Sequence, residues 1–152
     1  MSKYYIAYGS NLNIEHMKRI CPYSTPIGPT ILRNYRLAFK GTSFKSYLTI
    51  EPCEGSEVPV GLFKITPFDE SRLDFYEVVP TLYSKETISI TYNDETLEAL
   101  IYIMNPMYSY NLPSSLYISN CLKGYQDFKL DPEYIENALT VTKDNIAKKL
   151  LK

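Results

Sequence analysis

The chain of 152 residues is about the size of one domain and long enough to bury a core without disulfides or metal. Its 45% hydrophobic and 22% charged residues argue against both intrinsic disorder and a fibrous design. The 16 basic and 17 acidic residues are interspersed, with a formal charge of -1, so no run provides the basic surface of a nucleic-acid binder or a membrane-surface helix. We expect a single domain over residues 1–152, with neutral partners or small molecules as its ligands.

The N-terminus and the cysteines indicate a cytoplasmic protein. Met1-Ser2-Lys3 leads directly into strand-like sequence without the apolar run of a signal peptide, and no stretch approaches a transmembrane length. Cys21, Cys53 and Cys121 are odd in number and lack the CxxC spacing of zinc sites, so we interpret them as reduced, buried thiols. We therefore expect no metal and no membrane partner.

The first predicted element is a short strand over Tyr4 to Tyr8 that runs into the turn Gly9-Ser10-Asn11 and then into a helix. Gly permits unusual backbone dihedrals, and Ser and Asn favour turns and helix caps. Such a turn leaves backbone N–H groups pointing outward, where they can hold a carboxylate or a developing oxyanion. The alternative is an ordinary strand-to-helix connection.

The remaining elements follow from apolar periodicity and turn residues. In the first half we expect a helix from Ile14 to Cys21, a loop at Pro26 to Pro29, strands over Tyr35 to Lys40 and Tyr47 to Ile50, a turn at Pro52 to Glu57 and a strand over Val58 to Ile65. A helix capped by Asp69 that ends before Pro80 should follow, and then a hairpin of Leu82 to Tyr92 and Leu97 to Met104 about Asn93-Asp94. The chain should end with a loop over Asn105 to Pro113, a helix capped by Ser114-Ser115 and a terminal helix opened by Asp131-Pro132-Glu133. Sequential, hairpin-like strands with helices gathered at the end predict an α+β domain on an antiparallel, barrel-like sheet.

Glu77 has the least ordinary setting among the acidic residues, because it follows an amphipathic helix and directly precedes Val78-Val79-Pro80. Apolar neighbours desolvate a carboxylate, and a helix C-terminus repels negative charge, so both effects raise the pKa of Glu77 toward the range useful for proton transfer. The alternative is a solvated glutamate at a helix end.

Three motifs, in the same order along nearly the entire chain, resemble the γ-glutamylcyclotransferase (AIG2-like) family. They are Tyr8-Gly9-Ser10-Asn11-Leu12, then Leu73-Asp74-x-x-Glu77-x-x-Pro80-x-x-Tyr83, then Pro113-Ser114-x-x-Tyr117 with Gly124 and a terminal helix. The resemblance implies a small mixed, mostly antiparallel β-barrel flanked by helices, and conversion of γ-glutamyl amino acids or dipeptides to 5-oxoproline and a free amine. It also implies that no cofactor is needed, that the only partner is the substrate, and that the protein is a monomer or homodimer.

The resemblance assigns a role to each matching residue. In this chemistry the substrate's own α-amine attacks its γ-carbonyl, so the enzyme supplies geometry and one proton carrier rather than a nucleophile. That carrier, a general acid and base, falls on Glu77, and Gly9, Ser10, Asn11 and Leu12 would hold the glutamyl end through backbone N–H groups. The pocket-lining positions of the family fall on Tyr8, Tyr83, Tyr102 and Tyr117.

Two positions depart from the family. Val78 stands where the family usually has Gly, and a β-branched residue resists positive φ, so we expect a different loop there. Lys85 stands where Arg is common, which can lose a bidentate contact.

Four alternatives remain open on the sequence: a γ-glutamylamine cyclotransferase, a non-catalytic binder of glutamyl compounds, a serine hydrolase built on Ser10 and His16, and tyrosines 83 and 117 that serve only in packing. Against the hydrolase, His16 falls within the predicted helix and no G-x-S-x-G elbow surrounds Ser10.

Overall fold

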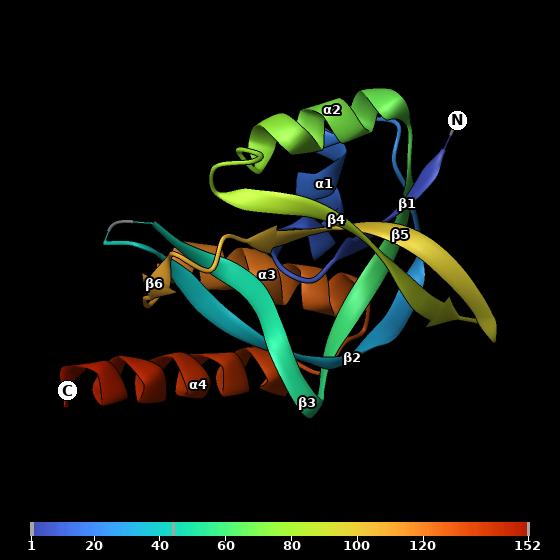
Figure 1. Ribbon diagram of the computed structural model, residues 1–152. Helices are drawn as coiled ribbons and strands as arrows, with labels where there is room; N and C mark the ends of the chain where they lie inside the picture. The colour runs from blue at the N-terminus through green and yellow to red at the C-terminus, as the bar shows by residue number, and fades with distance from the viewer. Residues whose placement is uncertain (1, 44, 152) are drawn as a thin grey trace.

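A computed structural model describes residues 2–43 and 45–151. Their strands form one six-stranded sheet in the order β4-β5-β1-β3-β2-β6 (Figure 1). The strands are β1 (Lys3–Ala7), β2 (Thr25–Thr42), β3 (Lys45–Ile65), β4 (Tyr83–Tyr92), β5 (Glu95–Met104) and β6 (Ser109–Tyr110). The β1–β5 pair is parallel and the other pairs are antiparallel, so the predicted α+β fold on a mixed, mostly antiparallel sheet is confirmed.

The sheet curls into an open barrel. Thr30 on β2 donates its hydroxyl to the carbonyl of Thr91 on β4 at 2.6 Å, and the Tyr92 hydroxyl donates to the carbonyl of Ile27 at 3.2 Å. These contacts join the two ends of the curl without forming a strand ladder there.

Four α-helices surround the described sheet, namely α1 (Ile14–Ile20), α2 (Pro67–Tyr76), α3 (Ser115–Asp127) and α4 (Glu133–Leu150). A short 3-10 turn over Ser10–Leu12 precedes α1, and α3 packs against it (Figure 1). The long helix α4 packs on β2, where the Thr142 hydroxyl accepts from the Phe39 N–H at 2.9 Å. None of the helices in the described ranges combines the length and the apolar content that crossing a membrane requires.

Two segments predicted as non-strand lie inside long strands. Pro26 to Pro29 belongs to β2, where a register shift between Pro26 and Gly28 accommodates it. In the described part of the chain β2 pairs with a second strand only at Lys40 and Gly41, so the missing N–H of these prolines removes no bond on that side. The prediction of a loop there is therefore wrong.

The predicted turn at Pro52 to Glu57 is a bulge within β3. Arg33 pairs with Glu57 and Tyr35 pairs with Pro52, so the segment 53–56 faces Asn34 alone. Asn34 has a φ of 67° and its side-chain oxygen accepts from the Gly55 N–H at 3.1 Å, which fixes the bulge. Turn-forming residues here bend a strand sharply without ending it (Figure 1).

The start of α2 also differs from the prediction. Its N-cap is Thr66, whose hydroxyl accepts from the Asp69 N–H, while Asp69 accepts from the Thr66 N–H in return. Asp69 is therefore the third residue of a capping box rather than the N-cap.

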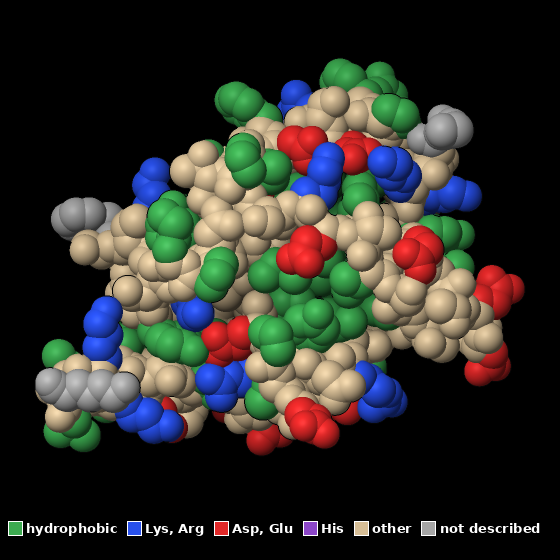
Figure 2. Space-filling model, viewed as in Figure 1, with side chains coloured by type: hydrophobic (Ala, Val, Ile, Leu, Met, Phe, Trp, Pro, Cys, Tyr) green, Lys and Arg blue, Asp and Glu red, His purple; other side chains and the backbone are tan. Residues whose placement is uncertain are grey.

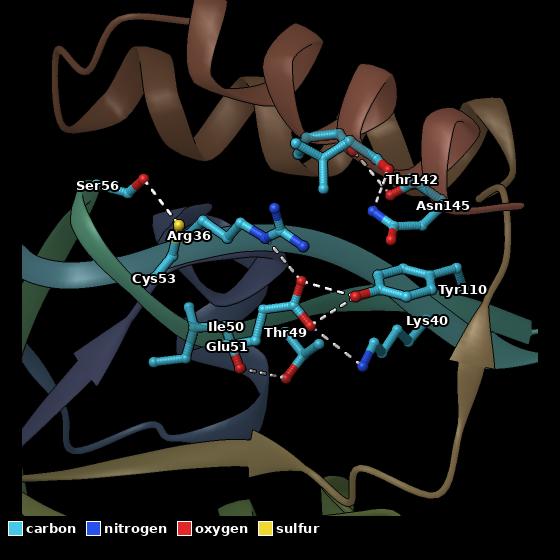
Figure 3. Close-up of polar contacts among 12 residues, drawn as sticks. Arg36, Lys40, Thr49, Ile50, Glu51, Cys53, Ser56, Tyr110, Thr142 and Asn145 are labelled. Carbon is cyan, nitrogen blue, oxygen red and sulfur yellow. Dashed lines mark hydrogen bonds and ion pairs between the residues drawn. The ribbon is translucent and has the colours of Figure 1, made fainter. Parts of the chain in front are cut away.

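Charged side chains are interspersed on the face seen in Figure 2, around an apolar area in its centre. One organised group, the Glu51 cluster, consists of Arg36, Lys40, Glu51 and Tyr110 and lies below α4 in Figure 3. The Glu51 carboxylate accepts from Arg36 at 2.8 Å and from the Tyr110 hydroxyl at 2.9 Å, and the Lys40 ammonium lies 3.3 Å away. These partners hold the pKa of Glu51 below its ordinary value against the opposing effect of burial.

Candidate active site

A cavity of about 330 Å³ opens between the end of β1, the Ser10–Leu12 turn, the C-terminal end of α2 and the start of α3. Eight of the nine residues predicted for the site line it: Tyr8, Gly9, Ser10, Asn11, Glu77, Tyr83, Tyr102 and Tyr117. The ninth, Leu12, is fully buried in the core instead. Segments that are distant in the sequence thus meet around one space.

Glu77 occupies the C-cap position of α2, as its place in the sequence predicted. Its N–H donates to the Leu73 carbonyl at 2.8 Å, so the last helical turn sets the direction of the side chain. The carboxylate oxygen Oε1 accepts from the Asn11 side-chain amide at 3.3 Å. Glu77 therefore faces the Gly9–Asn11 turn across the cavity.

The protonation of Glu77 is set by the removal of its carboxyl group from water. Burial raises the pKa of Glu77 from 4.5 to about 7, and the Asn11 hydrogen bond opposes the rise. Among the residues that the structure describes, no cationic side chain contributes to this shift. A carboxyl group with a pKa near neutrality can accept and return a proton under ordinary conditions.

The turn opposite Glu77 presents backbone donors. Among the described residues, the N–H groups of Gly9, Ser10 and Asn11 have no hydrogen-bond acceptor. The Leu12 N–H, in contrast, donates to the Gly9 carbonyl at 3.0 Å. The Leu12 N–H is therefore already engaged within the turn, and the open donors are those of the three preceding residues. A binding role for Leu12 stays a prediction.

Close packing of α3 holds this turn in place. A Cβ atom at Gly124 would lie 2.5 Å from the backbone of Leu12 and Asn13, so any side chain there would displace the turn. The Asn11 side chain, 5% exposed, adds a second restraint by donating to the Tyr5 hydroxyl at 2.9 Å.

The four predicted tyrosines form the floor of the cavity, three of them buried and Tyr117 half-buried, and their hydroxyls bond mainly to backbone. Tyr8 donates to the Tyr102 carbonyl at 2.5 Å and Tyr83 donates to the Leu48 carbonyl at 2.8 Å. The Tyr117 hydroxyl accepts from the Leu48 N–H at 3.0 Å. Burial, the largest cause in each case, raises the pKa of all four tyrosines, so they remain neutral.

Tyr102 differs from the other floor tyrosines because its hydroxyl points to α2. It donates to the Asp74 carboxylate at 2.7 Å, and Lys85 pairs with the other oxygen of Asp74 at 2.9 Å. Lys85 also pairs with Glu70 at 2.8 Å. The lysine at position 85 thus ties β4 to α2.

The rim of the cavity contains four residues that the sequence did not single out, namely Lys45, Tyr47, Tyr76 and Asn120. His16 and Val78, which the sequence singled out for other reasons, also lie on the rim. The His16 ring nitrogen Nε2 lies 3.0 Å from the Tyr76 hydroxyl, and burial followed by Arg19 lowers the pKa of His16. This imidazole meets a tyrosine rather than Ser10, so the pairing that a serine hydrolase needs is absent from the described residues. The position of Tyr76 next to Glu77 was the one sequence signal available.

Val78 adopts a left-handed backbone conformation, with a φ of 53°. The Val79 N–H donates to the Asp74 carbonyl at 3.0 Å and the Val78 N–H to the Phe75 carbonyl at 3.2 Å, which is the Schellman pattern of helix ends. The expectation that valine would avoid positive φ is therefore wrong. Left-handed geometry costs an ordinary residue roughly 1–2 kcal/mol.

Within residues 2–43 and 45–151, no group of three or more His, Cys, Asp or Glu side chains is placed to bind a metal ion.

Most of the chain matches one known protein family. Residues 5–120 match the family described as γ-glutamyl cyclotransferase, AIG2-like. A search of curated proteins gave no match.

Solved structures give the same result for the fold. One described as a γ-glutamyl cyclotransferase is 24% identical, with a TM-score of 0.81 over 91% of this chain and 86% of the other. An uncharacterized protein from Homo sapiens is 25% identical, with a TM-score of 0.79 over 90% and 86%. A γ-glutamyl cyclotransferase specific to glutathione, from yeast, is 10% identical, with a TM-score of 0.62 over 95% and 100%. The family match covers most of the chain, so this protein belongs to the γ-glutamyl cyclotransferase, AIG2-like family.

Proposed function

We propose that the protein is a γ-glutamylcyclotransferase that converts γ-glutamyl amino acids or dipeptides to 5-oxoproline and a free amine. The observation that carries this proposal is the pairing of one carboxyl group, whose pKa is about 7, with the open N–H groups of Gly9, Ser10 and Asn11 across a tyrosine-lined cavity. This arrangement supplies a proton carrier and an anion site without a protein nucleophile.

Ring closure begins with the substrate's α-ammonium group. The Glu77 carboxylate takes one proton from it, and the freed amine nitrogen attacks the substrate's own γ-carbonyl carbon. The new carbon–nitrogen bond closes a five-membered ring, and the carbonyl oxygen becomes an oxyanion. Because both reacting groups belong to one molecule, holding the chain folded back supplies most of the required rate enhancement.

The tetrahedral intermediate then collapses. The proton held by Glu77 passes to the leaving nitrogen, the carbonyl re-forms and the original amide bond breaks. The ring nitrogen loses its remaining extra proton to become the lactam N–H of 5-oxoproline, and the released amine takes up that second proton and leaves as an ammonium ion. Glu77 returns to its ionised form and no water is consumed. A pKa near 7 suits both transfers, since the same group must accept and donate within one cycle.

The floor and the turn would orient the glutamyl part of the substrate. The backbone N–H groups of Gly9, Ser10 and Asn11 can bind an anionic oxygen, either of the α-carboxylate or of the oxyanion. Neutral hydroxyls from buried tyrosines, fixed by backbone bonds, keep the floor rigid.

A screen of γ-glutamyl compounds tests the proposal. Purified protein is incubated with γ-glutamyl dipeptides, γ-glutamylamines including γ-glutamyl-lysine isopeptide, and glutathione, and 5-oxoproline release is measured. We expect release from the dipeptides, and we expect Glu77→Gln to reduce it by 10²–10⁴-fold, as loss of a general acid or base does.

The Gln variant must remain folded, which circular dichroism can establish. Normal turnover in this variant would contradict the role of Glu77. Release from γ-glutamylamines alone would identify the other cyclotransferase activity. Tight calorimetric binding without product would instead indicate a binding protein.

A further inference from the structure

The end of α2 places a valine where helix ends favour glycine. Val78 follows the C-cap Glu77 and has a φ of 53°, and the two bonds of the Schellman pattern fix it there. A β-branched side chain is poorly suited to this conformation, because its Cβ substituents crowd the backbone. Val78 therefore adopts a backbone conformation that is unfavourable for valine, directly beside Glu77.

Exposure divides the cavity into a floor and a rim. Three tyrosines of the floor, Tyr8, Tyr83 and Tyr102, are each less than 8% exposed, whereas the rim residues Val78 and Tyr76 are 50% and 44% exposed. The glutamyl part fits the floor, where the open N–H groups lie. The leaving amine consequently extends along the rim, past Glu77, which must reach its nitrogen.

Val78 lies between two pockets. It lines the catalytic cavity and also a second, outer groove that includes Ile20, Phe75 and Val79. Its half-exposed methyl groups have apolar surface left to bury. A ligand that covers them gains from removing this surface from water.

We propose that Val78 determines specificity, its isopropyl group forming an apolar wall against which the side chain of the leaving amine packs. The preferred substrates are then γ-glutamyl compounds whose leaving amine carries a branched aliphatic side chain. This inference rests on the proposed cyclotransferase function and names its substrate class more closely.

The test compares γ-glutamyl-leucine with γ-glutamyl-glycine, using the ratio of their kcat/KM values. We expect a ratio of roughly ten or more in the unchanged protein, because one or a few methylene groups in an apolar site discriminate by that order. Val78→Thr keeps the shape and the β-branch but adds a hydroxyl, so the ratio should fall about threefold to fivefold. Val79→Ala, outside the catalytic cavity, should leave the ratio unchanged.

Melting temperatures distinguish the backbone strain at Val78 from the contact that its side chain makes with the ligand. Val78→Gly removes both the strain and the wall, so the melting temperature should rise by roughly 2–4 °C. Val78→Ala removes the wall but keeps a Cβ atom, so the ratio should fall without that rise. Such a pattern would show that valine is kept for contact with the ligand rather than for stability.

Each failure has a distinct meaning. An unchanged ratio in the Thr and Ala variants, or no preference for γ-glutamyl-leucine in the unchanged protein, overturns the role of Val78 while turnover itself upholds the cyclotransferase. Absence of 5-oxoproline from every γ-glutamyl compound overturns the proposed function and, with it, this specificity. A melting temperature of Val78→Gly at or below that of the unchanged protein overturns the claim that valine is held under strain.

Discussion

Glu77 and Glu51 are both partly buried glutamates beside tyrosines, yet their pKa values move in opposite directions. Glu51 meets Arg36, Lys40 and the Tyr110 hydroxyl, which hold its pKa below the ordinary value (Figure 3). Burial raises the pKa of Glu77 to about 7, and among the described residues the Asn11 amide is the one partner that opposes the rise. Cations keep a carboxylate ionised, whereas burial without a cation leaves it able to exchange protons.

The pH dependence of turnover gives the largest test of this comparison. With the pKa of Glu77 at about 7, kcat/KM should fall at a rate that approaches tenfold per pH unit well below that value, or by about 50-fold between pH 7 and pH 5. Glu51→Gln should leave the shape of the profile unchanged, because Glu51 lies outside the cavity. A profile that is flat over this interval would contradict the assignment of Glu77 as the proton carrier.

Thermal stability should respond to the two glutamates with opposite signs. The raised pKa of Glu77 means that its contribution to stability is complete below its ordinary pKa of 4.5 and is lost as pH rises through about 7. Glu77→Gln should therefore stabilise the protein at pH 8, by up to about 3 kcal/mol, and have little effect at pH 4.

Glu51 has a lowered pKa, so its contribution is present above its ordinary value of 4.5 and is lost as pH falls through the folded-state value. Glu51→Gln should destabilise the protein at pH 8 by about 1–2 kcal/mol, because solvent screens a partly exposed cluster. Denaturation at both pH values, monitored by circular dichroism, measures the two differences. Effects of the same sign would refute the distinction.

Loss of the Asn11 amide should raise the pKa of Glu77 further and so widen its difference from the pKa of Glu51. Asn11→Leu removes the one bond that lowers the pKa of Glu77, so the acid limb of the pH profile should move upward and turnover at pH 7 should fall by roughly threefold to tenfold. Asn13→Ala, which removes only the cap of α1, is the control and should lower stability without moving the limb. An unmoved limb in Asn11→Leu would exclude this coupling.

The smallest effect is expected at Tyr110. Tyr110→Phe removes the hydroxyl that donates to both oxygens of Glu51, at a cost of about 1 kcal/mol in the free energy of unfolding. The Arg36 and Lys40 pairs remain, so 5-oxoproline release should be unaffected. Urea denaturation measures the change, and a loss above about 3 kcal/mol would mean that the cluster depends on this hydroxyl.

Sequence reasoning identified the parts of the site that depend on local structure. Strand, turn and helix around Gly9 to Asn11 follow from residue types, and the place of Glu77 at a helix end follows from the helix pattern before Pro80. Motif resemblance joined these two segments, which composition and periodicity alone would have left apart.

The missed features depend on long-range pairing. Lys45 and Tyr47 lie at the start of β3, where they pair with Thr42 and Lys40 of β2, and the fold brings this end of the hairpin to the rim. The long strands β2 and β3 also continue through proline and glycine residues, with a bulge over the segment 53–56. No local signal shows that an unpaired strand edge will tolerate Pro26. The positive φ of Val78 was likewise beyond prediction, because the bonds of the helix end overrode the preference of the residue.

Two floor tyrosines bond to Leu48, and this determines which changes in the sequence leave the floor intact. Tyr83 and Tyr117 bond to the main-chain carbonyl and N–H of Leu48, not to its side chain. Substitutions at position 48 that fit the core should therefore leave both hydroxyls in place through evolutionary drift. An insertion or deletion of one residue in the β2–β3 hairpin would instead present the neighbouring peptide group and dislodge both tyrosines together.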